Sequence, residues 1–458
     1  MPELKEYPEY KPTGNNFMPS LPSHWQQKRI GFSTTKINSG KTPTGGSESY
    51  QTEGIMLIRS QNVYDEGLRL EDVVYIDDET HAEMRNSRVA TDDVLLNITG
   101  ASLGRCAVYD LEDEANVNQH VCILRPSKGC SSSYLQCVTI SSIIKQQIFS
   151  LETGSSREGL NFQQISGLKI PFPPDPDEQE QIARFLDVSV GKIDTLVSKK
   201  RELIDLLQEK RRALVSRCVT RGLPPDAARA AGLDPQPKLK PSGVPWIGDI
   251  PENWDIKKFG YVSNVVRGAS PRPAGDSRFF NGDAMPWITV AEVTKDEEIY
   301  LTKTRTELTE EGVERSRIMP KGTLVLTNSG ATLGVPKILG ITGCANDGIV
   351  AFFDLSRKCS KQFLYHFLDG QTETLRERIK QGSGQPNLNT DIIRALRFPL
   401  PPTKEEQEAI VEYVNDASSR LQSLLGKAVD AIELLLEYRS ALITAAVTGK
   451  IDVREVEV

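Results

Sequence analysis

The chain has 458 residues, 38% hydrophobic and 26% charged, which is typical of a globular protein too long for a single core. The formal net charge of −7 argues against a protein that coats nucleic acid through phosphate neutralisation alone, but it leaves room for a specific binder with local basic patches. No apolar run is long enough for a membrane span and the N-terminus is polar, so we expect no membrane contact.

The cysteines and histidines are scattered along the chain. Seven cysteines occur without any C-x-x-C spacing, and the four histidines lie far apart in the sequence. This pattern predicts neither a disulfide framework nor a metal site. A protein of the reducing cytoplasm is the expectation that follows.

An internal repeat covers almost the whole chain. The segment Lys11–Trp25 returns as Lys240–Trp254, with an offset of 229 residues (254 − 25). Further matched pairs follow in the same order: loops at 37–46 and 265–275, β-type runs at 54–63 and 284–293, and strand-turn-strand segments at 94–109 and 324–339. In the last pair, the glycines of each Gly-x-x-x-Gly turn are predicted to form the turn, and the neighbouring Asn97 and Asn328 to bond it.

Two long helices are predicted, because Pro-Pro precedes each of them and acidic residues occupy its first turn. Residues at spacings of four and three form a heptad seam in the first helix: Ile182, Leu186, Ser189, Ile193, Leu196, Lys200, Leu203, Leu207, Lys210 and Leu214. The seam recurs 228 residues later as Ile410, Val414, Ala417, Leu421, Leu424, Ala428, Ala431, Leu435, Tyr438 and Leu442. Such seams are typical of a coiled coil, and we expect the two helices to pair with each other in antiparallel fashion. Parallel pairing would place the two globular domains side by side rather than at opposite ends.

Within each half, several short strands precede fewer helices, which predicts an α+β fold built from two similar domains in tandem. The predicted division of the chain is a first globular domain at 1–175, a central spacer helix at 176–222, a linker at 223–242, a second globular domain at 243–402, a distal helix at 403–450 and a tail at 451–458.

No catalytic signature is present in the sequence. The stretch Ser39–Thr42 ends like a phosphate-binding loop, but Thr35 occupies the place of the upstream glycine. Motifs of zinc proteases, serine hydrolases, dinucleotide-binding folds and amino-methyltransferases are also missing. We therefore expect a non-catalytic chain without a cofactor of its own.

Two similar but unlike domains on a rigid spacer suit the reading of two different half-sites on DNA at a fixed separation. The chain resembles the specificity subunits of type I restriction–modification systems along nearly its entire length. The motifs that carry the resemblance are the doubled W-x5-6-G (Trp25–Gly31, Trp254–Gly260), the Gly-Lys-Thr-Pro loop (Gly40–Pro43), the Gly-Ala-Ser-Leu-Gly and Gly-Ala-Thr-Leu-Gly turns, and the doubled P-P-x-x-x-E-Q-E-x-I (Pro173–Ile182, Pro401–Ile410).

The resemblance implies two target-recognition domains that read an asymmetric bipartite site in double-stranded DNA. It implies that the long helices fix the gap between the half-sites and dock methyltransferase subunits, of which two are expected, with restriction and translocase subunits as further partners. S-adenosylmethionine and ATP would then belong to those partner subunits. The alternative is a coiled-coil scaffold whose two domains bind other proteins.

Candidate DNA-binding residues follow from side-chain chemistry. Base contacts are predicted for Arg59, Ser60, Gln61 and Asn62, and for their counterparts Thr289 and Glu292, because arginine, amide and carboxylate groups read base edges. Phosphate contacts are predicted for Lys36, Lys41, Arg267 and Arg272 beside the two glycine loops. For all of these, the alternative is a solvated loop.

The first helix carries many cations. Of these, Lys199, Lys200, Arg211 and Arg212 are predicted to bind a partner subunit, with a solvated charged face as the alternative. Lys200 and Lys210 also interrupt the seam, and polar seam residues set helix register at a cost in stability.

Overall fold

The computed structural model describes residues 5–152, 159–330, 332–380 and 388–456. The chain divides into two compact units, Met1–Arg201 with Val429–Val458, and Glu202–Ala428. Both long helices, α6 (Pro176–Arg221) and α14 (Lys404–Val447), contribute one part to each unit. The boundaries of the two units therefore differ from those of the predicted domains, because the sheets of each unit share a core with the helix segments beside them.

The first unit is built around two four-stranded sheets. One sheet has the order β11 (Cys106–Val108), β10 (Val94–Asn97), β13 (Val121–Pro126), β4 (Thr34–Ser39). The other has the order β8 (Val74–Ile76), β5 (Ile55–Ile58), β12 (Ala115–Val117), β9 (Arg88–Val89), and its β5 and β12 run parallel. Short ribbons complete the strands: β1 (Tyr10–Pro12) with β2 (Ser20–Pro22), β3 (Gln26–Arg29) with β14 (Lys169–Phe172), and β6 (Val63–Tyr64) with β7 (Gly67–Leu68).

The second unit repeats the strand order of both four-stranded sheets. Its first sheet has the order β18 (Asn264–Arg267), β26 (Ile349–Phe353), β23 (Leu324–Thr327), β24 (Pro336–Leu339), β20 (Tyr300–Leu301), in which β20 is an additional edge strand. Its second sheet has the order β21 (Glu307–Leu308), β19 (Phe280–Ile288), β25 (Gly343–Ala345), β22 (Arg317–Met319), and β19 and β25 again run parallel. The ribbons are β15 (Leu239–Pro241) with β16 (Asp249–Pro251), and β17 (Asp255–Lys258) with β27 (Arg397–Leu400).

The shorter helices also occur in corresponding places. In the first unit they are α1 (Ile30–Ser33), α2 (Asp78–Glu83), α3 (Ser132–Ile140), α4 (Ser142–Glu152) and α5 (Phe162–Gly167). In the second they are α7 (Pro225–Ala230), α8 (Phe259–Val262), α9 (Val290–Val293), α10 (Glu310–Glu314), α11 (Lys361–Gly370), α12 (Thr372–Lys380) and α13 (Thr390–Ala395). Helix α7 falls inside the predicted linker.

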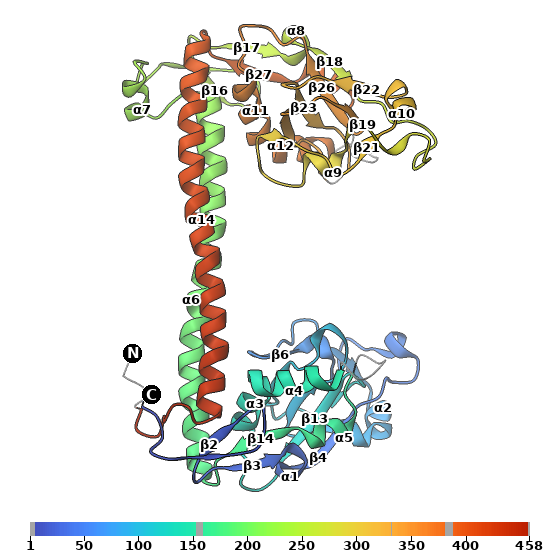
Figure 1. The fold of residues 1–458 in the computed structure, drawn as a ribbon, viewed down its shortest axis with the longest axis vertical. Coiled ribbons are helices and arrows are strands. Elements are labelled where there is room, and N and C mark those ends of the chain that lie inside the picture. The colour runs from blue at the N-terminus through green and yellow to red at the C-terminus, as the bar shows by residue number, and fades with distance from the viewer. Residues whose placement is uncertain (1–4, 153–158, 331, 381–387, 457–458) are drawn as a thin grey trace. The chain divides into compact units, whose positions relative to one another are not determined.

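Each unit has three layers, with helices on one face of the first sheet and the second sheet on the other face. Alternation along β10 explains the layering: Val94 and Leu96 lie in the core shared with the helices, whereas Leu95 lies in the core between the sheets. In the second unit Leu324 and Val325 of β23 divide in the same way. In Figure 1 the sheets of each unit lie beside the segments of the long helices that belong to the same unit.

The long helices are antiparallel. In the first unit the beginning of α6, with Ile182, shares a core with the end of α14, with Val447. In the second unit the end of α6, with Val219, shares a core with the beginning of α14, with Ile410. The predicted α+β fold with an antiparallel helix pair is confirmed.

The phase of the predicted seam was wrong at alternate positions. Leu196 is 48% exposed, whereas its neighbour Val197 is 4% exposed and lies in the core. In the same way Leu424 is exposed and Leu425 buried, Tyr438 is exposed and Arg439 faces inward to pair with Asp194 at 3.0 Å, and Lys210 is exposed. Adjacent apolar residues let the four-three alternation begin on either one, so spacing alone did not set the phase.

Candidate nucleic-acid interface

Loops from five strands meet at one end of the sheets in the first unit. Backbone hydrogen bonds join them: Gly40 N donates to Asn118 O at 3.1 Å, Asn118 N to Ile58 O at 3.1 Å, and Ile98 N to His120 O at 3.0 Å. Gly40, Ile98 and Asn118 follow β4, β10 and β12, Ile58 ends β5, and His120 precedes β13. We call residues 40–46, 59–62, 98–104 and 118–120 loop cluster 1.

Gly40 is required for this packing. A Cβ at this position would lie 1.6 Å from the carbonyl oxygen of Val117, so only glycine lets the loop approach β12 so closely. The approach brings the loop after β4 against the loop before β13. The sequence repeat places Gly40 opposite Gly268.

Loop cluster 1 presents a connected polar surface. The Thr42 hydroxyl donates to Gln119 Oε1 at 2.6 Å, the Gln119 amide lies 3.0 Å from His120 Nε2, and His120 Nδ1 lies 2.6 Å from the Thr99 hydroxyl. Thr42 and Gln119 are exposed, and His120 and Thr99 are half-buried. The Gln119 amide, held by Thr42 beside the His120 imidazole, offers both donors and acceptors. These groups can distinguish base edges in the major groove.

The predicted base-reading stretch Arg59–Asn62 lies in this cluster, but most of its groups serve the loop itself. Asn62 is fully buried, and its amide bonds Arg59 N, Arg69 O and Asp72 Oδ1. The Arg59 guanidinium donates to Asp72 O at 2.6 Å, and Ser60 O accepts from the Asn97 amide at 2.8 Å. Only Gln61 is exposed, and its amide donates to Asp72.

The two predicted phosphate-binding lysines differ in accessibility. Lys36 Nζ donates to Arg88 O at 2.9 Å, and burial beside the cation of Arg125 lowers its pKa. Lys41 is exposed, with Glu83 as a loose partner at 3.9 Å. Of the two, Lys41 is placed to meet a phosphate.

The second unit contains the same arrangement, which we call loop cluster 2 (residues 268–275, 289–294, 328–330, 332–334 and 346–348). Gly268 N donates to Ile349 O at 2.8 Å, Asn346 N to Ile288 O at 3.0 Å, and Asn328 N to Gly348 O at 2.9 Å. A Cβ at Gly268 would lie 2.1 Å from the Asn346 carbonyl oxygen. The hydrogen bonds of Asn346 and Asn328 match those of Asn118 and Ile98, so the two clusters share most of their backbone arrangement.

The side chains of loop cluster 2 are different. Asp347 takes the place of Gln119, and its Oδ1 accepts from the Ser270 hydroxyl at 2.7 Å, just as Gln119 accepts from Thr42. Arg272 pairs with Asp347 Oδ2 at 3.1 Å, and the Arg267 guanidinium donates to the Asp347 backbone carbonyl. The Ser270 hydrogen bond and the two arginines hold the pKa of Asp347 below its usual value, so this cluster presents a carboxylate and guanidinium groups.

Thr289 and Glu292 act within their loop. Thr289 caps α9 by accepting from Glu292 N at 3.3 Å. Glu292 is buried, and it pairs with Lys295 at 3.1 Å and accepts from Arg305 N at 3.1 Å. Like Asn62, Glu292 sets the shape of its loop.

Asn97 ends β10 and Asn328 directly follows β23, so the backbone hydrogen bonds match Asn97 with Thr327 and Asn328 with Ile98; both asparagines are buried. Asn97 bonds Ser60 rather than its own turn, and its Oδ1 has no hydrogen-bond partner among the described residues. Within the same described ranges both amide atoms of Asn328 are unpaired. The turn glycines at 100, 104, 330 and 334 all have positive φ, as a turn-forming role predicts; Ala331 lies outside the described residues.

The four cations predicted to bind a partner fall into two pairs. Arg211 and Arg212 are engaged within the second unit, with Glu297 at 2.6 Å and with Glu373 respectively. Lys199 is exposed and Lys200 is half-buried in the first unit. Lys199 is therefore the most accessible of the four to a partner.

Thr42, Gln119, His120, Ser270 and Asp347 are not among the DNA-binding residues predicted from the sequence. The repeat matches Asn118–Val121 with Asn346–Ile349 but assigns the pair no role. Asparagine is the same in both copies, whereas Gln119 is replaced by Asp347. This difference is the signal in the sequence that could have indicated a base-reading position. Among the described residues no group of histidine, cysteine or carboxylate side chains is arranged to hold a metal ion. None of the helices in the described part of the chain has the length and apolarity that a membrane span needs.

The doubled fold and doubled loop clusters define a protein of tandem recognition domains, and comparison with known proteins identifies the family. The family model described as type I restriction modification DNA specificity domain matches residues 22–205 and again residues 251–433. The chain belongs to this family.

Individual relatives are similar over almost the full length. The type I restriction enzyme StySPI specificity subunit of Salmonella potsdam is 22% identical over 449 residues, which cover 92% of this chain and 91% of that protein. The EcoKI specificity subunit of Escherichia coli (strain K12) is 21% identical over 452 residues, with the same coverages. A solved structure from work on complex assembly and conformational transition of the type I R-M system matches with a TM-score of 0.68 at 17% identity, covering 94% of this chain and 99% of that one.

Proposed function

We propose that this chain is the DNA-reading specificity subunit of a type I restriction–modification complex. Each unit reads one half of an asymmetric bipartite site, and its loop cluster contacts the bases. Membership of the DNA specificity family supports this function and does not favour a scaffold that binds only proteins.

One observation carries the proposal: the two units use a similar backbone arrangement to hold different side chains at corresponding positions of their loop clusters. Thr42 holds Gln119 in one unit, and Ser270 holds Asp347 in the other. Glutamine pairs with adenine through both of its amide atoms, whereas aspartate accepts from the amino group of cytosine. Two unlike half-sites follow from this difference.

The remaining roles are assigned by accessibility. Lys41, Gln61 and His120 are the further contacts that we propose for the first unit, and Arg272 and Arg267 those for the second, with the arginines reading guanine or a phosphate. Asn62 and Glu292 shape their loops and do not contact bases. The buried carboxamide of Asn328, unpaired among the described residues, would bond a bridging water beneath loop cluster 2.

Methyl transfer and DNA cleavage belong, by this proposal, to partner subunits that bind S-adenosylmethionine and ATP. Two methyltransferase subunits and the restriction subunits assemble on this chain, with Lys199 among the contacts. The chain itself is non-catalytic, and its cytoplasmic location stays a prediction.

Selection of bound sequences from random double-stranded DNA tests the function. The wild-type chain, assembled with its methyltransferase subunits, is expected to enrich two short unlike sequences at a fixed gap. Gln119→Ala should remove preference in one half only, and Asp347→Asn in the other half only. Lys321→Ala, at an exposed turn outside both clusters, is the control and should leave both halves intact. Failure to enrich any sequence, or loss of both halves in each variant, would contradict the proposal.

A further inference from the structure

A second repeated surface lies at the opposite end of the sheets from the loop clusters. In the first unit Phe32 of α1 precedes β4 and is 77% exposed; in the second, the equivalent Tyr261 of α8 precedes β18 and is 79% exposed. A single exposed aromatic ring is unremarkable on a protein surface. Repetition at the same position in two diverged units indicates a shared role.

Cations occupy matching positions on the ribbon next to each of these rings, and Lys258 Nζ lies 5.7 Å from the centre of the Tyr261 ring. Arg29 of β3 lies directly opposite Lys169 of β14, and Lys258 of β17 lies directly opposite Arg397 of β27. Like charges directly opposite on an antiparallel ribbon are destabilising. Within the described residues Arg29, Lys169 and Arg397 make no ion pair, so the repulsion is not relieved inside the chain.

A third element completes each patch. The loop that carries Lys128 is fastened to α1 by Ser127 N donating to Ser33 O at 2.9 Å, and the loop that carries Arg357 is fastened to α8 by Ser356 N donating to Val262 O at 2.8 Å. We call the sets Phe32, Arg29, Lys169, Lys128 and Tyr261, Lys258, Arg397, Arg357 the basic aromatic patches.

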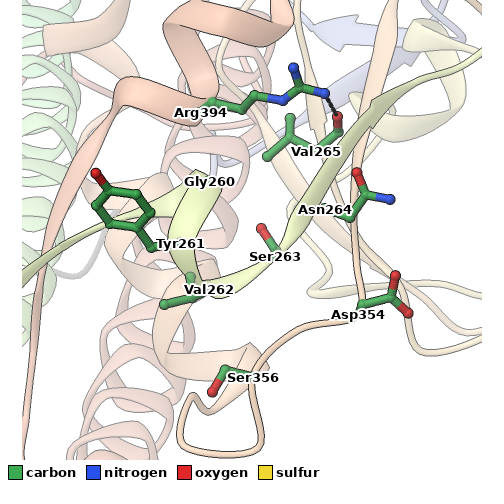
Figure 2. Close-up of a pocket in the computed structure, with 9 residues that line it drawn as sticks. All are labelled: Gly260, Tyr261, Val262, Ser263, Asn264, Val265, Asp354, Ser356 and Arg394. Atoms are coloured by element: carbon green, nitrogen blue, oxygen red, sulfur yellow. Dashed lines mark hydrogen bonds between the residues drawn. The ribbon is translucent and has the colours of Figure 1, made fainter.

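Packing beneath the rings holds the patches in place. A Cβ on Gly31 would meet the Ser166 hydroxyl at 2.1 Å, and a Cβ on Gly260 would meet the Arg394 side chain at 3.1 Å. Figure 2 shows that Tyr261 borders an open hollow of about 440 Å³, with Arg394 and Asp354 on different sides of it. Arg394 donates to Val265 O at 3.1 Å, so its guanidinium is fixed at this rim.

The position of the patches separates them from the proposed DNA contacts. Strand β4 joins Phe32 to the Gly40 loop and is six residues long, so its ends are about 20 Å apart. A duplex that contacts only the loop cluster would leave the other end of the strand accessible to a second partner. Aromatic side chains and arginines are enriched at the centres of protein interfaces, and the unpaired cations suit a partner with carboxylates.

We propose that each basic aromatic patch docks an acidic surface of a protein partner, with Phe32 or Tyr261 seated in an apolar slot. The partner is a methyltransferase subunit, one at each patch, and this assignment rests on the proposed function. The rings anchor the interface and the cations pair with carboxylates around the slot. Because both patches share this chemistry, one type of subunit fits both units although their DNA loops differ.

Native mass spectrometry of the full chain mixed with the methyltransferase subunit of the same system tests the proposal. Phe32→Ala and Arg29→Glu are expected to weaken binding of one subunit at least roughly tenfold, and Tyr261→Ala and Lys258→Glu that of the other. Phe32→Tyr and Arg29→Lys keep the chemistry and should assemble like wild type. Phe149→Ala is the matched control, because Phe149 is also exposed, at 67%, but lies on α4 outside both patches.

Selective DNA binding by the chain alone is measured in parallel, which separates this proposal from the proposed function. Loss of assembly with DNA binding retained supports the docking role. Unchanged assembly in all four variants, loss of DNA affinity instead of assembly, or a wild-type chain that reads DNA but binds no methyltransferase subunit would each overturn it. Absence of selective DNA binding by the wild type, both alone and assembled with the methyltransferase subunits, would instead contradict the proposed function.

Discussion

The indole nitrogen of Trp25 donates a hydrogen bond to the carboxylate of Glu178 at 3.0 Å. The second unit repeats this bond between Trp254 and Glu406 at 2.8 Å. The two most distinctive motifs of the sequence, the tryptophan before the first sheet and the acidic start of each long helix, are thus joined. The next residue of the helix motif is Gln179 in the first unit and Gln407 in the second. Its side chain accepts a hydrogen bond from the backbone N of Ser131 or Ser360, and so ties the start of α3 or α11 to the same corner.

Replacing Trp254 by Phe should destabilise the second unit by about 1–3 kcal/mol, because it leaves a partly buried carboxyl without its donor. Burial already raises the pKa of Glu406, and the indole hydrogen bond opposes that shift. Urea unfolding followed by circular dichroism measures the change. Glu406→Gln retains an acceptor for the indole and should lose less stability; an equal or greater loss would show that the bond contributes little.

Gly40→Ala should displace loop cluster 1, because the new methyl group would overlap the Val117 carbonyl oxygen. We expect a loss of several kcal/mol, on the scale of severe packing errors, together with lost DNA recognition in one half-site. Gly191→Ala is the matched control, since a methyl group added to Gly191 in α6 would meet no atom within 4 Å, and it should be neutral or stabilising. A Gly40→Ala protein with wild-type melting and binding would refute the requirement for glycine.

His366 makes stability depend on pH. Burial lowers its pKa to about 4, against the hydrogen bond to Asn415 at 2.9 Å. Above the unfolded pKa of about 6.5 both states are neutral, so the full stability is present; as the pH falls from about 6.5 to 4, the unfolded state gains a proton that the folded state does not, and roughly 3 kcal/mol is lost. The wild type should therefore lose stability over this interval more steeply than His366→Gln. Parallel pH profiles of the two proteins would contradict the buried neutral state.

Lys200→Leu should raise the melting temperature without abolishing DNA recognition. Lys200 is half-buried at the seam between the long helices, and a leucine there would add apolar packing worth about 1 kcal/mol. Lys199→Leu, one residue earlier and exposed, is the control and should give no gain. A lower melting temperature for Lys200→Leu would contradict the prediction that this polar seam residue costs stability.

Local signals in the sequence were enough for the architecture. The repeat, the Pro-Pro helix starts and the heptad spacing predicted two α+β domains and two long helices, because each signal acts over a few residues. The phase of the seam could not be predicted from spacing alone. Leu196 and Val197 are adjacent and both apolar, and tertiary packing decides which one is buried.

The site was harder to predict because it is assembled from distant segments. Thr42 and Gln119 are 77 residues apart in the chain, and Ser270 and Asp347 likewise, so neither pair leaves a local pattern. Asn62 and Glu292 have the chemistry of base readers, but their burial became visible only with the fold. Residue type pointed to loops of the two clusters, and burial in the fold decides which of their side chains are accessible.

Modified-base sequencing of the source genome with and without this gene tests the central claim most directly. The account predicts that deletion removes methylation at one bipartite motif with two unlike halves and a fixed gap, and that Gln119→Ala in the restored gene alters one half alone. An unchanged methylome in a strain shown to express the protein would contradict the account.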